Sequence, residues 1–143
     1  MHEHNEIALG FDFGLKRIGV AVGQTLTCSA TPLDTLYAKN GVPEWNQIQK
    51  LIKEWQPTLL IVGIPLNMDD SEQAITHAAK QFAKELNTRF NLPISEVDER
   101  LSTKEARQQI FDAGGYKALK ETPIDSIAAV IILEQWLRAH EHK

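Results

Sequence analysis

Three short runs of apolar residues open the chain and are separated by compact turns. The pattern predicts strands at about residues 7–13 and 18–23, joined by a tight turn at 14–17, and a third strand within 27–37. Because short turns connect these strands, we expect them to form an antiparallel meander.

After the third strand, the spacing of apolar residues changes. Between Trp45 and Trp55 they recur at the spacing of a helix, and the wholly apolar run 58–63 is typical of a strand buried on both faces of a parallel sheet. A helix at about 71–90 and a strand at 93–97 follow in the same alternation.

The last third of the chain predicts two more helices. A capping box at Ser102 and Glu105 opens one that reaches about residue 113. Thr122 and Pro123 begin a final helix that is apolar nearly all round, so we expect it to be largely buried. The order β-β-β-α-β-α-β-α-α predicts an α/β protein. Its five-stranded mixed sheet has three antiparallel and then two parallel strands flanked by helices, which is the order of the ribonuclease H-like fold.

Length and composition fit one globular domain over residues 1–143, with polar tails at 1–6 and 139–143. No apolar run is long enough for a transmembrane helix, and the polar start lacks the pattern of a secretory signal. The single cysteine, Cys28, excludes an internal disulfide, so we expect a cytoplasmic protein. The net charge of −4 argues against a protein that coats nucleic acid, although it permits a local basic patch.

Asp12 is the most informative polar residue because it lies inside an apolar strand, between Phe11 and Phe13. Aspartate is a poor strand former, and a buried carboxylate needs a cation or a dense hydrogen-bond network. We interpret Asp12 as a functional acid. The alternative is a structural aspartate that bonds into the turn at Gly14.

Asp98 and Glu99 follow the apolar part of the last predicted strand. The carboxyl ends of strands are where open α/β sheets bind ligands. Because neighbours in a strand point to opposite faces, we expect only one of the two at a site, with Glu99 preferred and Asp98 structural. The alternative is that both acids merely complement the N-terminus of the following helix.

Asp125 occupies the third position of the last predicted helix. An acid there reaches back to a threonine cap such as Thr122 and complements the helix dipole, and taken alone this structural role is the favoured one. Asp125 becomes a candidate metal ligand because Asp12 and Glu99 already supply two acids.

Three carboxylates from separate parts of the chain suit one or two Mg²⁺ or Mn²⁺ ions, which prefer hard oxygen ligands. Two such ions about 4 Å apart hold the attacking water and the leaving oxygen of a phosphodiester. No protein nucleophile is then needed, in agreement with the lack of a convincing Ser-His-Asp or Cys-His signature. The five histidines lack metal-site spacing, and we interpret them as solvated.

Four polar residues near these acids are candidates for substrate binding. Lys16 and Arg17 stand in the first turn and could hold a phosphate, although such turns are commonly only solvated. Arg100 adjoins Glu99 and could orient it or bind phosphate. Asn67 lies in the loop after the buried strand, which should border the same cleft.

Four segments together resemble the YqgF family, also called RuvX, in the family's order across nearly the whole chain. They are ALGFDFGLKRIGVA at 8–21, VGIPLN at 62–67, VDERLST at 97–103 and DSIAA at 125–129. The chain departs from the family pattern at two points. Residues 68–70 replace the usual glycine after the Pro-Leu loop, and Phe11 replaces the usual small residue before the first aspartate.

The family comprises pre-16S ribosomal RNA nucleases related to Holliday junction resolvases. The resemblance implies a ribonuclease H-like fold with Asp12, Glu99 and Asp125 as the acidic, metal-binding site. It implies a hydrolase, a metal-dependent endonuclease in maturation of the 5′ end of pre-16S ribosomal RNA. The expected partner is a ribosomal RNA precursor, free or on the small-subunit particle. We expect the protein to be a monomer or a homodimer and to have no membrane partner.

Three alternatives stay open. A Holliday junction resolvase would use the same acids on DNA, and it should be a two-fold dimer because it cuts two strands symmetrically. A non-catalytic ribosome-assembly factor would keep a vestigial site, but clustered carboxylates repel each other without a cation. The Asp-Phe-Gly sequence before a hairpin also resembles a phosphate loop of actin-like ATPases, which bind nucleotide between two domains where this chain supplies one.

Overall fold

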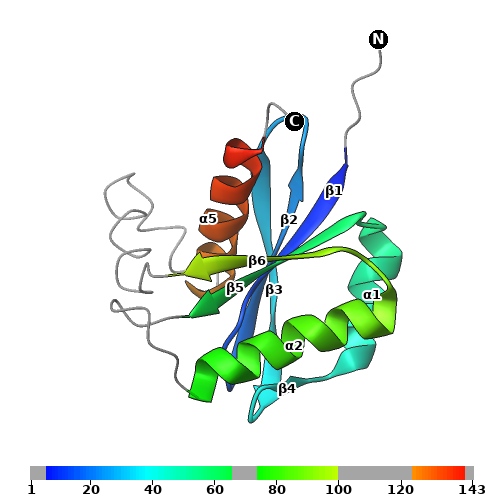
Figure 1. Cartoon of the computed structure of the whole chain (residues 1–143). Coiled ribbons are helices and arrows are strands. Elements are labelled where there is room, and N and C mark those ends of the chain that lie inside the picture. The colour runs from blue at the N-terminus through cyan, green and yellow to red at the C-terminus, as the bar shows by residue number, and fades with distance from the viewer. Residues whose placement is uncertain (1–5, 66–73, 100–123, 141–143) are drawn as a thin grey trace.

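A computed structural model describes residues 6–65, 74–99 and 124–140 (Figure 1). The elements in chain order are β1 (Ile7–Asp12), β2 (Arg17–Gln24), β3 (Ser29–Lys39), β4 (Val42–Pro43), α1 (Trp45–Trp55), β5 (Leu59–Pro65), α2 (Ala74–Phe90), β6 (Ile94–Glu99) and α5 (Ile124–Ala139). The helix expected at 102–113 lies outside the described residues. No helix in these three described stretches has the length and apolar character needed to span a membrane.

The strands form one mixed sheet in the order β4-β3-β2-β1-β5-β6. The first three strands are antiparallel neighbours, while β5 runs parallel to β1 and β6 runs parallel to β5. Helices cover both faces of the sheet (Figure 1). The predicted meander, the two parallel strands and the flanking helices are therefore confirmed.

The predicted number of five strands is wrong, because β4 adds a sixth. Asn40 and Gly41 both have positive φ, 52° and 84°, and this left-handed pair turns β3 back on itself. Ala38 and Lys39 then pair with Pro43 and Val42. An Asn-Gly pair is a strong hairpin signal, since both residues tolerate positive φ, so the sequence did carry a sign of this turn.

The two faces of the sheet carry separate cores. Alternate residues of β1, among them Leu9 and Phe11, pack in a large cluster with the buried side chains of α1 and α2. Ala8, on the other face, packs in a smaller cluster with residues of α5. Residues two apart in a strand share a face, so these clusters assign each strand position to the α1 and α2 side or to the α5 side.

Helix α5 lies very close to the sheet, because glycines of β1 and β2 face it. An added Cβ at Gly10 would come within 3.0 Å of the Leu133 Cβ, and one at Gly23 within 2.8 Å of the Leu133 Cδ2. Leu133 itself is fully buried. The predicted burial of the last helix is confirmed, and the contact with two glycines fixes its height above the strands that carry the candidate site.

Candidate active site

Asp12 is the last residue of β1 and is half-buried. In this strand Ala8 packs against the α5 cluster, and Gly10 faces Leu133 of α5. Asp12 continues that alternation and therefore lies on the α5 face, at the carboxyl end of a strand. This is the edge at which open α/β sheets bind ligands, whereas the sequence predicted a strand that continued to about residue 13, with Asp12 inside it.

Both strands that flank Asp12 carry a glycine at its level. Asp12 pairs with Gly19 of β2 on one side and with Gly63 of β5 on the other, and both glycines are buried. The neighbouring strands therefore place no side chain beside the carboxylate. Glycine within a strand often marks a point where a ligand or another backbone approaches closely. The sequence alone does not reveal these two glycines as neighbours of Asp12, because the arrangement depends on the register between strands.

The register separates Glu99 from Asp98. Val97 pairs with Gly63 and belongs to the α5 cluster, whereas Asp98 is exposed and pairs with Ile64, which is buried in the α1 and α2 core. Position 99 pairs with Pro65. It lies two residues after Val97, so this strand position belongs to the same face of the sheet as Val97 and Asp12. The Glu99 side chain lies outside the described residues. The backbone nevertheless favours Glu99 over Asp98.

Ser126 holds the first turn of α5 beside the end of β1. Its side chain is fully buried, and its Oγ accepts a hydrogen bond from the Val20 amide at 3.4 Å and lies 3.1 Å from the Thr35 Oγ1. The register of β2 and β3 shifts at this point. Val20 comes directly after Gly19, the residue that pairs with Asp12. Because Ser126 bonds to Val20, its neighbour Asp125 has its backbone at the same edge of the sheet. The Asp125 side chain lies outside the described residues.

The turn between β1 and β2 carries two of the predicted substrate-binding residues. Lys16 and Arg17 are both exposed, and the Lys16 carbonyl accepts a hydrogen bond of 2.8 Å from the Ala38 amide of β3. A Cβ added at Gly14 would overlap the Arg17 carbonyl oxygen, so this tight turn requires glycine. The other two predicted binding residues, Asn67 and Arg100, lie outside the described residues.

The backbone thus brings three predicted acidic positions to one edge of the sheet: the ends of β1 and β6 and the first turn of α5. In the described part of the chain no three histidine, cysteine or acidic side chains converge on a metal site. Two of the three predicted ligands have side chains beyond that part, so the metal cluster stays a prediction. Of the five histidines, His77 and His140 are described and both are exposed, as predicted.

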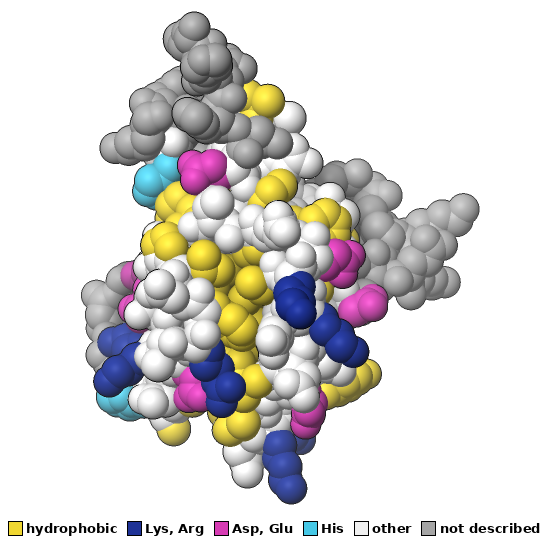
Figure 2. All heavy atoms as spheres, turned by 90° about the vertical axis from the view of Figure 1, so that its right-hand side faces the viewer, with side chains coloured by type: hydrophobic (Ala, Val, Ile, Leu, Met, Phe, Trp, Pro, Cys, Tyr) yellow, Lys and Arg dark blue, Asp and Glu magenta, His cyan; other side chains and the backbone are white. Residues whose placement is uncertain are grey.

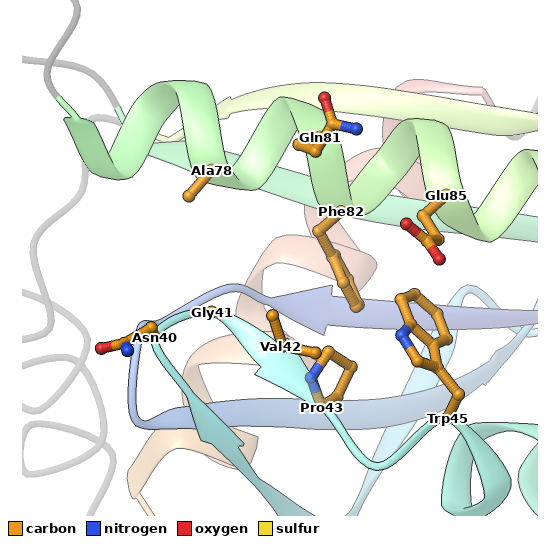
Figure 3. A pocket seen from close by; sticks show the side chains of 9 residues that line it. All are labelled: Asn40, Gly41, Val42, Pro43, Trp45, Ala78, Gln81, Phe82 and Glu85. Atoms are coloured by element: carbon orange, nitrogen blue, oxygen red, sulfur yellow. The ribbon is translucent and has the colours of Figure 1, made fainter.

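The opposite side of the molecule carries an apolar hollow between α2 and the β3–β4 hairpin (Figures 2 and 3). Its cavity of about 130 Å³ is lined mainly by apolar side chains, including Trp45 and Phe82, together with two amides, Asn40 and Gln81, and one acid, Glu85. Glu85 forms an ion pair with Arg89 at 2.8 Å, and the Arg89 guanidinium lies 4.5 Å from the centre of the Trp45 ring. A single neutralised carboxylate does not provide the ligands of a divalent-metal site.

Comparisons with known proteins give consistent results. Residues 6–139 match the family model of RuvX, described as Holliday junction resolvase. A Legionella pneumophila (strain Philadelphia 1) protein named "Putative pre-16S rRNA nuclease" is 60% identical over 135 residues, which cover 94% of this chain and 97% of that protein. A protein of the same name from Actinobacillus pleuropneumoniae serotype 5b is 56% identical over 131 residues, covering 92% and 96%.

Two solved structures share the fold. Thermus thermophilus RuvC in complex with a Holliday junction substrate matches with a TM-score of 0.60 and 16% identity, over 94% of each chain. The fowlpox virus Holliday junction resolvase matches with a TM-score of 0.55 and 13% identity, over 93% of this chain and 98% of that one. The predicted ribonuclease H-like fold is thus confirmed.

Proposed function

The chain belongs to the RuvX family, and on that premise we propose that it is a divalent-metal-dependent endonuclease that matures the 5′ end of pre-16S ribosomal RNA. The observation that carries the proposal is the position of Asp12. A half-buried carboxylate ends a core strand between two buried glycines, with positions 99 and 125 at the same edge. Two relatives with the name "Putative pre-16S rRNA nuclease" are more than half identical to the chain over nearly its whole length.

Asp12, Glu99 and Asp125 are the residues that would hold Mg²⁺ or Mn²⁺. Carboxylate oxygens are the ligands these ions prefer, and the glycines beside Asp12 leave its flanks without side chains, so the residues fit such an ion. Once bound, one or two ions would activate water and stabilise charge on the phosphodiester. The anchoring of Ser126 to β2 keeps the first turn of α5, and with it Asp125, at this edge.

Lys16 and Arg17 would bind the phosphate backbone of the substrate. Both are exposed next to the end of β1, and the hydrogen bond from Ala38 to the Lys16 carbonyl holds their turn. Lysine and arginine form charge-assisted hydrogen bonds with phosphate oxygens. In this proposal Asn67 and Arg100, which follow β5 and β6 in the sequence, complete the substrate contacts.

The proposal is tested by cleavage of a 16S ribosomal RNA precursor with an extended 5′ end, in Mg²⁺ or Mn²⁺ and in excess EDTA. We expect Asp12→Asn and Glu99→Gln each to lower kcat by at least about 100-fold, since a bound metal stabilises the transition state by several kcal/mol. Asp98→Asn is the matched control, because Asp98 pairs at the Ile64 position of the opposite face and should retain activity. Full cleavage by Asp12→Asn, or by wild type in EDTA, would refute the proposal.

A second candidate substrate is a four-way DNA junction, because the matching family model is described as a Holliday junction resolvase. The same acids would serve either nucleic acid, and discrimination depends on substrate shape and on contacts to the 2′-hydroxyl. The junction is therefore assayed beside the RNA precursor with the same variants. Cleavage of the junction alone, with symmetric cuts in two strands, would favour the resolvase activity.

A further inference from the structure

Tyr37 of β3 is a large aromatic side chain that the fold leaves in solvent. It is 71% exposed, although its neighbour Leu36 is only 6% exposed and packs in the core under α1 and α2. Tyr37 therefore lies on the α5 face of the sheet, which is the face of Asp12. Thr35, two residues earlier, confirms this face, because its hydroxyl lies 3.1 Å from the Ser126 Oγ of α5.

Helix α5 covers β3 only as far as Thr35. The Ala30 amide bonds to the Glu134 Oε2, and Thr35 meets Ser126 in the first turn of the helix. The described part of α5 thus follows β3 over these residues and leaves Tyr37 beyond its first turn. A ring this exposed contributes little to the stability of the core, so core packing does not explain why a tyrosine stands at position 37.

Cations surround Tyr37. Arg17 is its direct partner across β2 and β3, and Lys39 is two residues further along β3 on the same face. Lys16 adjoins Arg17, and all three basic side chains are exposed. Within residues 6–65, 74–99 and 124–140, none of the three forms an ion pair. Asp34, an exposed acid, is three residues from Tyr37 in β3, whereas Arg17, Lys16 and Lys39 all lie within two strand positions of it.

This surface is continuous with Asp12. Gly19 pairs with Asp12, Arg17 is two residues from Gly19 along β2, and Tyr37 pairs with Arg17. Two strand spacings and two residues of strand separate the Tyr37 and Asp12 backbones, which is about 12 Å. A single strand whose phosphate lies at Asp12 can therefore reach Tyr37 with an adjacent nucleotide.

We propose that Tyr37 is a stacking platform for one unpaired base of the substrate, and that Arg17 and Lys39 bind the phosphates on either side of that base. The inference rests on the proposed nuclease function and specifies its substrate as a strand that is unpaired next to the cleaved bond. Aromatic side chains stack on bases that are splayed out of a helix, and basic residues beside them follow the backbone. A base that stays paired within a duplex cannot lie on the ring in this way.

The test measures binding of a short fluorescein-labelled single strand, as RNA and as DNA, by fluorescence anisotropy in EDTA so that no cleavage occurs. We expect Tyr37→Ala to weaken binding by about 5- to 150-fold, the range that base–aromatic stacking gives. Tyr37→Phe should bind as wild type, because the ring is kept. Leu26→Ala, at an apolar side chain that is 53% exposed in the turn between β2 and β3, is the matched control and should change nothing.

A series of oligonucleotides with one abasic residue moved along the strand identifies the stacked base. Wild type should lose affinity when the abasic residue reaches one position, and Tyr37→Ala should show no such position. Lys39→Ala should lower the slope of log K against log salt by about 0.7, as the loss of one contact to a single-strand phosphate does. Lys53→Ala, an exposed lysine of α1 on the other side of the sheet, should leave that slope unchanged.

Equal binding by Tyr37→Ala and Leu26→Ala would overturn the proposal, and so would an equal loss of affinity for fully paired duplex. A loss of affinity in Tyr37→Ala for only one of the two single strands would support the proposal and show whether the preferred substrate is RNA or DNA. The cleavage assay with Asp12→Asn is independent of these measurements. If wild type cleaves normally but Tyr37→Ala binds the single strand as wild type does, only the stacking platform is refuted. If Tyr37→Ala weakens binding but wild type never cleaves, only the nuclease function is refuted.

Discussion

Ser126→Ala removes the hydroxyl that ties α5 to β2 and β3, and the structure sets the size of the effect. The substitution leaves the buried Val20 amide without its acceptor and the Thr35 hydroxyl without its partner. An unsatisfied buried donor costs about 1–3 kcal/mol, and the length of the Val20 bond, 3.4 Å, places it near 1 kcal/mol. The half-buried Thr35 contact adds about 0.5–1 kcal/mol. We therefore expect a loss of about 1.5–2 kcal/mol in the free energy of unfolding.

Urea and thermal unfolding measure this loss directly. For a chain of this length, about 1.5–2 kcal/mol corresponds to a fall in Tm of about 5–7 °C. Thr27→Ala is the matched control, because the Thr27 hydroxyl also contacts a serine, Ser29, at 2.6 Å but in an exposed turn. Its effect should stay within about 0.5 kcal/mol.

The same substitution should lower kcat, because the first turn of α5 carries Asp125. A double-mutant cycle of Ser126→Ala with Thr35→Val isolates the contact between the two hydroxyls and should show a coupling of at least about 0.5 kcal/mol. If Ser126→Ala costs no more stability than Thr27→Ala, the anchoring of α5 at this point is refuted.

Three further substitutions test the packing around the site. Gly14→Ala should lower the free energy of unfolding by about 1–3 kcal/mol, measured by thermal unfolding, since the new Cβ overlaps the Arg17 carbonyl oxygen and the turn must shift. Gly63→Val should reduce cleavage at least about tenfold in the precursor assay, because it places a branched side chain in a buried position beside Asp12; unchanged kcat would show that this flank is not used. Leu133→Ala should cost about 2–5 kcal/mol in urea unfolding, because the side chain is fully buried; a cost below about 1 kcal/mol would contradict the close packing of α5 on the sheet.

The sequence predicted the layered fold because its signals are local. The short apolar runs of β1 and β2, the wholly apolar β5 and the helical spacing from Trp45 to Trp55 each report how a segment is buried. The β4 strand was missed for a physical reason. A pair of residues is too short to show a period, and only the Asn40-Gly41 turn reveals it.

The candidate site was predicted less completely, because its arrangement depends on register. Alternation in β6 indicates that Asp98 and Glu99 face opposite ways, but only pairing with β5 shows which position shares the face of Asp12. The two glycines beside Asp12 are far from it in sequence and meet it only through strand pairing. Tyr37 carries no signal of its own, since a tyrosine in a strand is ordinary core material until its neighbours are placed.

The central claim is that Asp12 holds a divalent cation for phosphodiester hydrolysis. Calorimetric titration of Mn²⁺ into wild type and Asp12→Asn, each with a non-cleavable RNA present, tests it most directly. We predict that wild type binds Mn²⁺ and that Asp12→Asn loses at least about tenfold in affinity, because the carboxylate supplies a charged oxygen ligand that the amide does not. Equal binding by the two proteins, or no binding by wild type with the RNA present, would contradict the account.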